Sequence, residues 1–501
     1  MGSAPLLLAP ASCRRPHSTR LVCSVSASHS EPTAPVEVNT LPPGVWPASA
    51  HRLDSGSVSG GCVSVGGVSL PQLREQVGTP VFVIDEDDVR ARARRTLAAF
   101  ESAAATHGAS ARVYYAGKAF LCVEMVRWMM NAGLRVDVCS GGELMLAQAA
   151  GADPALLGFH GNNKSVAELE LAVSAGVGTI VLDSDIELER VAAIAERLGV
   201  TQSVMVRVNS GVHAQTHNYL ATAHEDQKFG ISLAAAPAAV QRIREIDALR
   251  FVGLHCHIGS QIFGAEGFRE SAARLIELHA ELAADGDVPI LNLGGGFGIA
   301  YTEADDPTDI ETLAEAIVSA VADECSVRGV PIPELAFEPG RIIVGPPGIT
   351  LYEVGTVKPV QVDEELTRLY VSVDGGMSDN ARPALYDAKY SARIVSRESD
   401  AEPALARVVG MHCEAGDIVV DSEYLPADVV PGDLLAVPGT GAYCHALASN
   451  YNLVPRPPVV AVSDGEIRVL IRRETISDIL ARDLSAVAAG FSEPTTEGRN
   501  D

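Results

Sequence analysis

Four short segments carry side chains that could act together on an aldehyde that also bears a phosphate. They contain Lys118, His257, the glycines 294–296 and Glu338. A lysine amine among apolar neighbours can lose its proton readily enough to attack an aldehyde and form an imine. Successive glycine N–H groups can point into one concavity and bind phosphate. A carboxylate beside a pyridine nitrogen keeps that nitrogen protonated, so the ring can accept an electron pair, and an imidazole could lie flat against the ring.

Each feature also has a plainer interpretation when it is taken alone. A glycine run is more often an ordinary turn. Lys118 could be a surface lysine, and His257 could be a core histidine bonded to a backbone carbonyl. The chemical interpretation is favoured because all four segments follow predicted strands, and active sites of parallel barrels lie at the carboxyl ends of the strands.

A repeated strand–helix pattern between about residues 110 and 340 would position these residues. Its eight apolar runs are Val113–Tyr115, Leu134–Val138, Leu156–Phe159, Thr179–Leu182, Val204–Val208, Phe251–His255, Ile290–Leu293 and Leu335–Phe337. Helices are predicted at Val166–Ala175, Ile186–Leu198 and Gly267–Ala284, where apolar residues recur every three or four positions. Eight strands close an α/β barrel of the (β/α)8 TIM type, whereas an open doubly wound sheet, the alternative, usually has fewer.

After Gly340 the composition changes to prolines, glycines and short alternating runs, which predict an antiparallel β domain. Its expected strands are Leu369–Val373, Ala406–Val409, Asp417–Val420 and Leu434–Val437. Two earlier fragments, Cys62–Val65 and Val81–Ile84, are expected to complete this domain. The predicted organisation is a disordered tail at 1–40, an N-terminal segment at 41–80, the barrel at 81–345, the β domain at 346–485 and a loose tail at 486–501.

Composition excludes several classes of protein. With 501 residues, of which 47% are hydrophobic, the chain can bury a large core and is not a disordered protein. Its 38 basic and 64 acidic residues give a net charge of −26, which repels polyanions. We therefore expect no nucleic-acid partner and no membrane partner, and the apolar runs are too short to span a bilayer.

The nine cysteines include no C-x-x-C pair and are odd in number, which argues against a disulfide framework and against a metal site. A reducing, cytoplasmic location is therefore expected. The first thirty residues contain Arg14, Arg15 and Arg20 but no acid before Glu31. A transit peptide for a plastid or another organelle is the alternative interpretation of this tail.

Several segments in combination match a known family. They are Tyr115-Ala116-Gly117-Lys118-Ala119, Ser140-Gly141-Gly142-Glu143-Leu144, His160-Gly161-Asn162-Asn163-Lys164, His257-Ile258-Gly259-Ser260-Gln261, Gly294-Gly295-Gly296, Glu338-Pro339-Gly340-Arg341, Gly375–Tyr386, Cys413-Glu414 and Gly441-Ala442-Tyr443. Over residues 40–485 the chain resembles the pyridoxal-phosphate decarboxylases of the alanine-racemase-like fold, and within them the diaminopimelate decarboxylase family. The resemblance implies pyridoxal 5′-phosphate as cofactor. It also implies decarboxylation of meso-2,6-diaminopimelate to L-lysine, the last step of lysine biosynthesis.

The resemblance further implies a role for each matching residue. Lys118 would carry the cofactor as a Schiff base, His257 would stack on its ring and Glu338 would pair with the ring nitrogen. The phosphate end would be held by Ser260, Gly294, Gly295, Gly296, Gly340 and Arg341. The distal end of the substrate would be bound by Arg341, Arg382, Tyr386 and Glu414, with Tyr443 contacting cofactor and substrate. Cys413 would lie near the reacting carbon.

In this family Cys413 and Glu414 reach across from a second subunit, so a homodimer is implied. The substrate assignment also has a chemical basis, because diaminopimelate ends in an amino acid group that needs a cation for its carboxylate and an anion for its ammonium. The alternatives are a related decarboxylase acting on ornithine, arginine or carboxynorspermidine, a racemase on the same scaffold, and a catalytically silent homologue. Cys413, His257 and Lys118 are all candidates to return the proton to the product.

Overall fold

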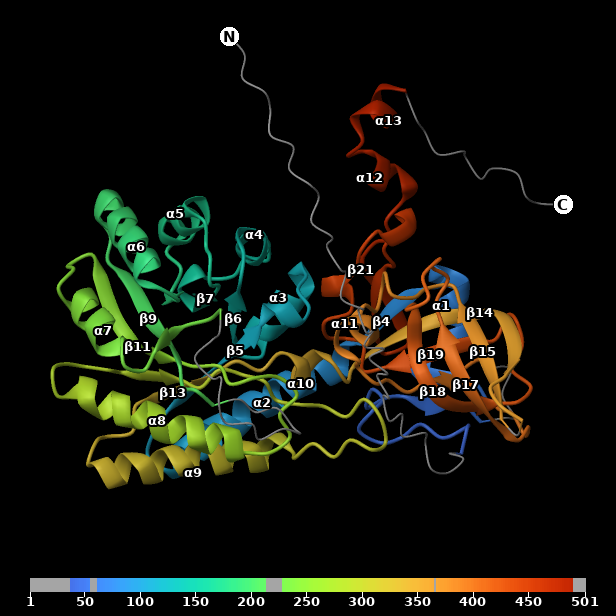
Figure 1. Ribbon diagram of the computed structural model, residues 1–501, viewed down its shortest axis with the longest axis horizontal. Helices are drawn as coiled ribbons and strands as arrows, with labels where there is room; N and C mark the ends of the chain where they lie inside the picture. The colour runs from blue at the N-terminus through green and yellow to red at the C-terminus, as the bar shows by residue number, and fades with distance from the viewer. Residues whose placement is uncertain (1–36, 55–60, 213–227, 365, 490–501) are drawn as a thin grey trace, which may run out of the picture. The chain divides into compact units, whose positions relative to one another are not determined.

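The computed structural model describes residues 37–54, 61–212, 228–364 and 366–489, and Figure 1 labels its elements. Within these residues, parallel strands close into a barrel formed by β5 (Ala111–Ala116), β6 (Arg135–Val138), β7 (Leu157–Phe159), β8 (Thr179–Leu182), β9 (Gln202–Asn209), β11 (Leu249–His255), β12 (Ile290–Asn292) and β13 (Glu334–Phe337). The pairings of β8 with β9 and of β13 with β5 close the ring, and the short β10 (Ile231–Ser232) adds to β9. All eight strands predicted from the sequence are confirmed, and so is the (β/α)8 fold.

Helices alternate with these strands along the chain. They are α2 (Glu86–Thr106), η1 (Gly117–Ala119), α3 (Val123–Asn131), α4 (Gly141–Ala149), η2 (Pro154–Leu156), α5 (Val166–Ala175), α6 (Asp185–Leu198), α7 (Ala236–Arg244), α8 (Glu266–Ala283), α9 (Ile310–Arg328) and α10 (Arg341–Val344). Side chains of Ser140, Ser165, Ser184 and Asp309 accept hydrogen bonds from the first turns of α4, α5, α6 and α9, which fixes where these helices begin. The three helices predicted from periodicity are confirmed within one residue at each end.

A second sheet is formed mainly by the chain that follows the barrel, and it is drawn mostly in orange in Figure 1. Its strands are β4 (Val81–Asp85), β14 (Gly348–Gln361), β15 (Thr367–Val373), β16 (Arg393–Ile394), β17 (Pro403–Val409), β18 (Ile418–Pro426), β19 (Leu434–Pro438), β20 (Val459–Ser463) and β21 (Glu466–Ile471). Most pairs are antiparallel, as predicted, but β15 with β17 and β4 with β20 are parallel, so the sheet is mixed. Long connections separate the members of each parallel pair, and such connections are what parallel pairing requires.

The N-terminal segment completes this domain, with one correction to the predicted boundary. The predicted fragment Val81–Ile84 is β4, which pairs with β14 and β20 and not with a barrel strand. The predicted barrel range 81–345 is therefore wrong at its start, and the first barrel element is α2. The fragment Cys62–Val65 is found as β2 (Val63–Val65) in a small sheet with β1 (His51–Arg52) and β3 (Val68–Ser69), followed by α1 (Leu70–Val77). Residues of β2 nevertheless share a hydrophobic core with β4, β14 and β19.

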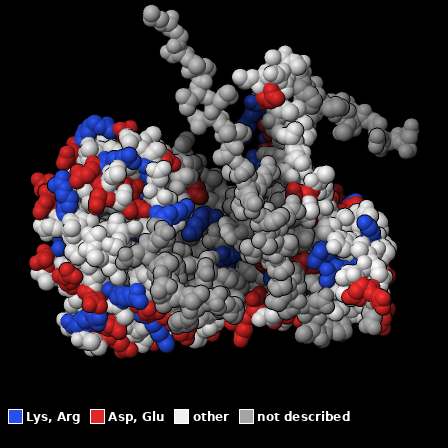
Figure 2. Space-filling model, in the orientation of Figure 1, with Lys and Arg blue, Asp and Glu red and all other residues white. Residues whose placement is uncertain are grey.

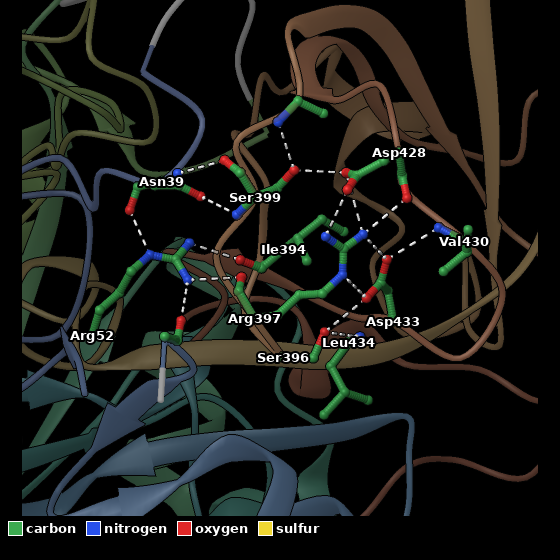
Figure 3. Close-up of polar contacts among 12 residues, drawn as sticks. Asn39, Arg52, Ile394, Ser396, Arg397, Ser399, Asp428, Val430, Asp433 and Leu434 are labelled. Atoms are coloured by element: carbon green, nitrogen blue, oxygen red, sulfur yellow. Dashed lines mark hydrogen bonds and ion pairs between the residues drawn. The ribbon is translucent and has the colours of Figure 1, made fainter. Parts of the chain in front are cut away.

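Polar contacts tie the start of the described chain to the β domain (Figure 3). The side-chain amide of Asn39 donates to the carbonyl of Ser399 at 2.8 Å, and its oxygen accepts from the N–H of Ser399 at 3.1 Å. Arg52 donates to the carbonyls of Asn39 and Arg397, and Arg397 pairs with Asp433 at 2.8 Å. The end of the predicted tail 1–40 is therefore part of the fold, and residues 1–36 lie outside the described residues.

The C-terminal residues contain α12 (Ile476–Leu480) and α13 (Leu484–Ala488), after the short elements α11 (Arg382–Tyr386), η3 (His445–Leu447) and η4 (Tyr451–Leu453). The predicted loose tail thus begins inside α13, and residues 490–501 lie outside the described part. Among the described helices, none is long and apolar enough to cross a membrane. On the face shown in Figure 2, acidic and basic side chains are interspersed.

Candidate active site

The four chemically loaded segments lie where β5, β11, β12 and β13 end. Lys118 follows β5 in η1, and Glu338 directly follows β13. The N–H of Gly295 donates to Nδ1 of His257 at 3.3 Å, and the N–H of Glu338 donates to the carbonyl of Gly294 at 2.8 Å. Lys118, in η1, is near enough for its charge to lower the pKa of His257. The barrel therefore brings together the residues that the sequence predicts to work together.

The carboxylate of Glu338 faces the side-chain nitrogens of three residues. Its Oε1 accepts from the amide of Asn292 at 2.7 Å and lies 3.0 Å from Nε2 of His255 and 3.5 Å from Nε2 of His160. Burial alone would raise the pKa of Glu338, but the facing imidazoles lower this pKa well below its usual range. Its Oε2 has no hydrogen-bond partner among the described residues. Glu338 is therefore a carboxylate with one oxygen available to a ligand.

Neutral groups surround this carboxylate. Burial lowers the pKa of His160 and of His255 to about 4, so both rings are uncharged near neutral pH. Asp137, in β6, lies 3.2 Å from Nε2 of His160, and burial together with the charge of Glu338 raises its pKa well above normal. The cluster thus concentrates one negative charge on Glu338. His160, His255 and Glu338 also place possible metal-ligand atoms within 4.8 Å of one another. Oε1 of Glu338 already accepts a hydrogen bond from Asn292, so it needs no metal ion as a partner.

His257 and Lys118 differ in their contacts with the rest of the protein. Burial, and then the charge of Lys118, lowers the pKa of His257 to about 3, and its Nδ1 accepts a hydrogen bond from Gly295. His257 is therefore a neutral ring near neutral pH. The side chain of Lys118 is exposed and forms no hydrogen bond or ion pair with the described residues. Its amine is free to bind a ligand.

The glycines after β12 form a cradle that side chains would fill. A Cβ on Gly295 would overlap the carbonyl oxygen of Glu338, and a Cβ on Gly296 would overlap that of Gly259. Gly294 has a φ of 70°, in the left-handed region that favours glycine. Backbone donors in such a concavity suit a phosphate group. The cradle, the free amine and the free carboxylate oxygen fit one phosphate-bearing aldehyde with a ring nitrogen.

Two predicted residues border the same mouth. Gly340 precedes α10, and a Cβ on it would lie 3.0 Å from the Cβ of Ala116 at the end of β5. The N–H of Tyr443 donates to the carbonyl of Ala119 at 2.8 Å, which ties the loop after β19 to η1. The ring of Tyr443 lies 4.6 Å from the guanidinium carbon of Arg341. Tyr443 therefore reaches the barrel mouth from the β domain.

Two predicted arginines meet at one tyrosine hydroxyl. Arg341 donates to the hydroxyl of Tyr301 and, at 2.7 Å, to Oγ of Ser260. Arg382 donates to the hydroxyls of Tyr301 at 2.7 Å and of Tyr390 at 2.5 Å. Both arginines are buried. The two cations form the polar end of the site.

Three predicted residues are exposed in one copy of the chain. Tyr386 is 66% exposed, and Cys413 and Glu414 are also exposed. Within the described residues, no hydrogen bond or ion pair joins their side chains to Lys118, Glu338 or the arginines. Among the described residues, the polar contacts of one copy therefore do not link these three side chains to the barrel mouth.

The turn that carries Cys413 and Glu414 is nevertheless firmly held. The buried carboxylate of Asp417 accepts from the N–H of Met377 at 2.6 Å and from the N–H of His412 at 2.8 Å. The ring of His412 lies 2.8 Å from Oγ of Ser378. Cys413 and Glu414 thus project from a fixed support.

Sequence reasoning assigned no role to several residues of the site. Asp137, His160, His255 and Asn292 end or follow barrel strands, so the rule that singled out Lys118 could have found them. The two phenols beside the arginines, Tyr301 and Tyr390, lie in loops and carry no motif of their own.

Comparisons with known proteins agree with this geometry. The family model "Pyridoxal-dependent decarboxylase, pyridoxal binding domain" matches residues 87–345. Diaminopimelate decarboxylase of Mycobacterium tuberculosis H37Rv is 52% identical over 456 residues, covering 89% of this chain and 99% of that protein. The enzyme of that name from Corynebacterium efficiens is 46% identical over 452 residues, covering 89% and 96%. A crystal structure of diaminopimelate decarboxylase from M. jannaschii in complex with L-lysine superposes with a TM-score of 0.80 at 30% identity, covering 87% and 98%.

Proposed function

The chain belongs to the pyridoxal-dependent diaminopimelate decarboxylase family, and on this premise we propose which of its residues perform each part of the reaction. It is an enzyme that converts meso-2,6-diaminopimelate to L-lysine and carbon dioxide with pyridoxal 5′-phosphate, in lysine biosynthesis. One observation carries the residue assignment. The free amine of Lys118, the glycine cradle and the free carboxylate oxygen of Glu338 meet at one end of the barrel.

The cofactor half of the site is assigned from these contacts. When bound, pyridoxal 5′-phosphate supplies an electron-poor ring that accepts the electron pair left by the departing carboxylate. The amine of Lys118 would bind its aldehyde carbon, and Glu338 would keep its ring nitrogen protonated. The glycine loop 294–296, Gly340 and Ser260 would hold its phosphate; the N–H of Gly294 already donates to Asn292 and that of Gly295 to His257, so the N–H groups of Gly296 and Gly340 would be the donors. The neutral ring of His257 would pack against the pyridine ring.

The substrate half is assigned to Arg341, Arg382, Tyr386, Glu414 and Tyr443. Buried guanidinium groups favour an anion, and two of them can hold the distal carboxylate of diaminopimelate by paired hydrogen bonds. Glu414 is assigned to the distal ammonium. An ornithine-like substrate has no distal carboxylate and would leave both buried cations without an anion, which disfavours the alternative decarboxylases.

The exposure of Cys413 and Glu414 supports a homodimer in which these two residues complete the site of a second copy. Cys413 then lies near the reacting carbon. Burial, and then the charge of Lys118, lowers the pKa of His257 to about 3, which favours Cys413 and Lys118 over His257 as the group that returns the proton.

A cytoplasmic location is also part of the proposal. The described cysteines are all unpaired, which supports a reducing compartment. A fluorescent fusion of the whole chain that accumulated in an organelle would favour the transit-peptide alternative.

Absorbance and product analysis test the assignment. Wild-type protein mixed with pyridoxal 5′-phosphate and meso-diaminopimelate is expected to show a visible band and to release equal amounts of lysine and carbon dioxide. Lys118→Ala should lose the band and at least about 1,000-fold in kcat. The matched control is Lys389→Ala, because the Lys389 side chain is 65% exposed and pairs with Asp421 at 3.8 Å rather than with a residue of the site. An unchanged band in Lys118→Ala, or faster turnover of ornithine than of diaminopimelate by wild type, would contradict the proposal.

A further inference from the structure

Arg341 and Arg382 differ from another buried arginine in this chain. They are only 9% and 7% exposed, and among the described residues neither forms an ion pair with a carboxylate. Arg393, at 1% exposed, has Glu303 at 2.9 Å and Glu423 at 3.0 Å. A buried charge without a counter-charge is costly, so such a charge indicates a site for an anion. Arg341 and Arg382 together therefore form a binding site for an anion.

Tyr301 is the residue that joins the two cations. Its hydroxyl oxygen accepts one hydrogen bond from Nη1 of Arg341 and one, at 2.7 Å, from Nη1 of Arg382. Its ring also lies against both guanidinium groups, with centroid distances of 5.8 Å and 4.8 Å. A hydroxyl oxygen has two lone pairs, and both are taken by the arginines. Only the O–H hydrogen of Tyr301 remains to be used.

That hydrogen has no acceptor among the described residues. The neighbouring phenol of Tyr390 differs, because its hydroxyl also lies 3.6 Å from the sulfur of Cys444. Burial raises the pKa of Tyr301 although both arginines oppose this, so the phenol keeps its hydrogen at neutral pH. A buried donor with no partner in the protein is expected to bond to a ligand.

The position of Tyr301 is fixed by its backbone and ring. Its N–H donates to Asp305 at 3.0 Å, and its carbonyl accepts from Oγ of Ser391 at 3.2 Å. Its ring meets that of Tyr390 edge to face, at 5.0 Å between centroids and 72° between planes. These contacts come from the loop after β12 and from the β domain. The hydroxyl is therefore a preorganised donor.

We infer that Tyr301 is a third substrate-binding residue, which donates its O–H to the distal carboxylate while holding Arg341 and Arg382 on either side of it. The inference rests on the proposed function, because it deepens the assignment of the same carboxylate. It makes Tyr301 a specificity residue for amino acids that carry a carboxylate at the end remote from the reacting carbon. Ligands without that carboxylate would gain nothing from the phenol.

Two ligands that differ only in this group provide the test. L-lysine, the reaction product, retains the distal carboxylate, and 1,5-diaminopentane lacks it. Their inhibition constants are measured against diaminopimelate with the holoenzyme and with Tyr301→Phe, which keeps the packed ring. We expect Tyr301→Phe to weaken L-lysine binding about tenfold and to raise KM for diaminopimelate similarly. The inhibition constant of 1,5-diaminopentane and the visible cofactor absorbance should be unchanged.

Tyr390→Phe is the matched control, since it also removes a hydroxyl from Arg382, and we expect it to change L-lysine binding less than about threefold. If Tyr301→Phe does not fold, Asp305→Asn is measured instead, because it loosens the Tyr301 backbone. It should also weaken the binding of L-lysine more than the binding of 1,5-diaminopentane. Equal weakening of both ligands, no weakening, or an equal effect of Tyr390→Phe would overturn the inference. A wild-type enzyme that binds L-lysine no better than 1,5-diaminopentane would instead overturn the proposed function.

Discussion

The barrel mouth and the β-domain turn at Cys413–Glu414 differ in how they hold the side chains that carry chemistry. At the mouth, Glu338 accepts a hydrogen bond from Asn292 and faces His255 and His160 of the same chain, and burial lowers the pKa of these two histidines to about 4. At the turn, Asp417 fixes the backbone, but the two side chains that carry chemistry are exposed. On the proposed assignment, this difference means that one chain supplies the cofactor half, whereas a second copy completes the substrate half.

The largest effect should come from breaking the barrel mouth alone. Gly295→Ala places a methyl group on the carbonyl oxygen of Glu338, so the glycine loop must shift away from Glu338. We expect cofactor affinity to fall about 100-fold, which corresponds to roughly 3 kcal/mol. Titration with pyridoxal 5′-phosphate, followed by absorbance, gives the value. Gly355→Ala is the control because its Cβ would make only an ordinary contact at 3.7 Å. Equal cofactor affinity in the two variants would show that the cradle does not bind the phosphate.

A smaller effect should come from loosening the turn alone. Asp417→Asn replaces one carboxylate oxygen by an amide that cannot accept from both Met377 and His412. We expect kcat/KM for diaminopimelate to fall about tenfold while the cofactor affinity stays at the wild-type value. The exposed Asp428 provides the comparison variant, Asp428→Asn, which should leave both constants unchanged. A parallel loss of cofactor from Asp417→Asn would mean that the two regions are not separable.

The sequence predicted the barrel well because its signals are local. Strands such as Thr179–Leu182 are buried along their whole length, and α4, α5, α6 and α9 begin at a capping serine or aspartate, so these elements could be placed without knowing their partners. The partners of β4 could not be predicted in the same way. Its pairing with β14 joins segments more than 250 residues apart, and no turn between them sets the register.

The site residues at strand ends could also be predicted from the sequence, whereas those in loops could not. Strand ends converge by the geometry of a parallel barrel, which is why Lys118 and Glu338 could be paired from sequence. Tyr301 lies in a loop, and its meaning arises only where Arg341 and Arg382 approach it from different elements. The exposure of Glu414 was likewise invisible in the sequence, because it depends on how Asp417 turns the chain.

A heterodimer assay tests the division of the site most directly. Chains carrying Lys118→Ala and Glu414→Ala, each with its own affinity tag, are co-expressed and the mixed dimers are purified through both tags. Each variant alone should be nearly inactive. If Glu414 completes the site of the other copy, the mixed dimer has one intact site of two and should show about half of the wild-type kcat. A mixed dimer no more active than the Glu414→Ala homodimer would contradict the account.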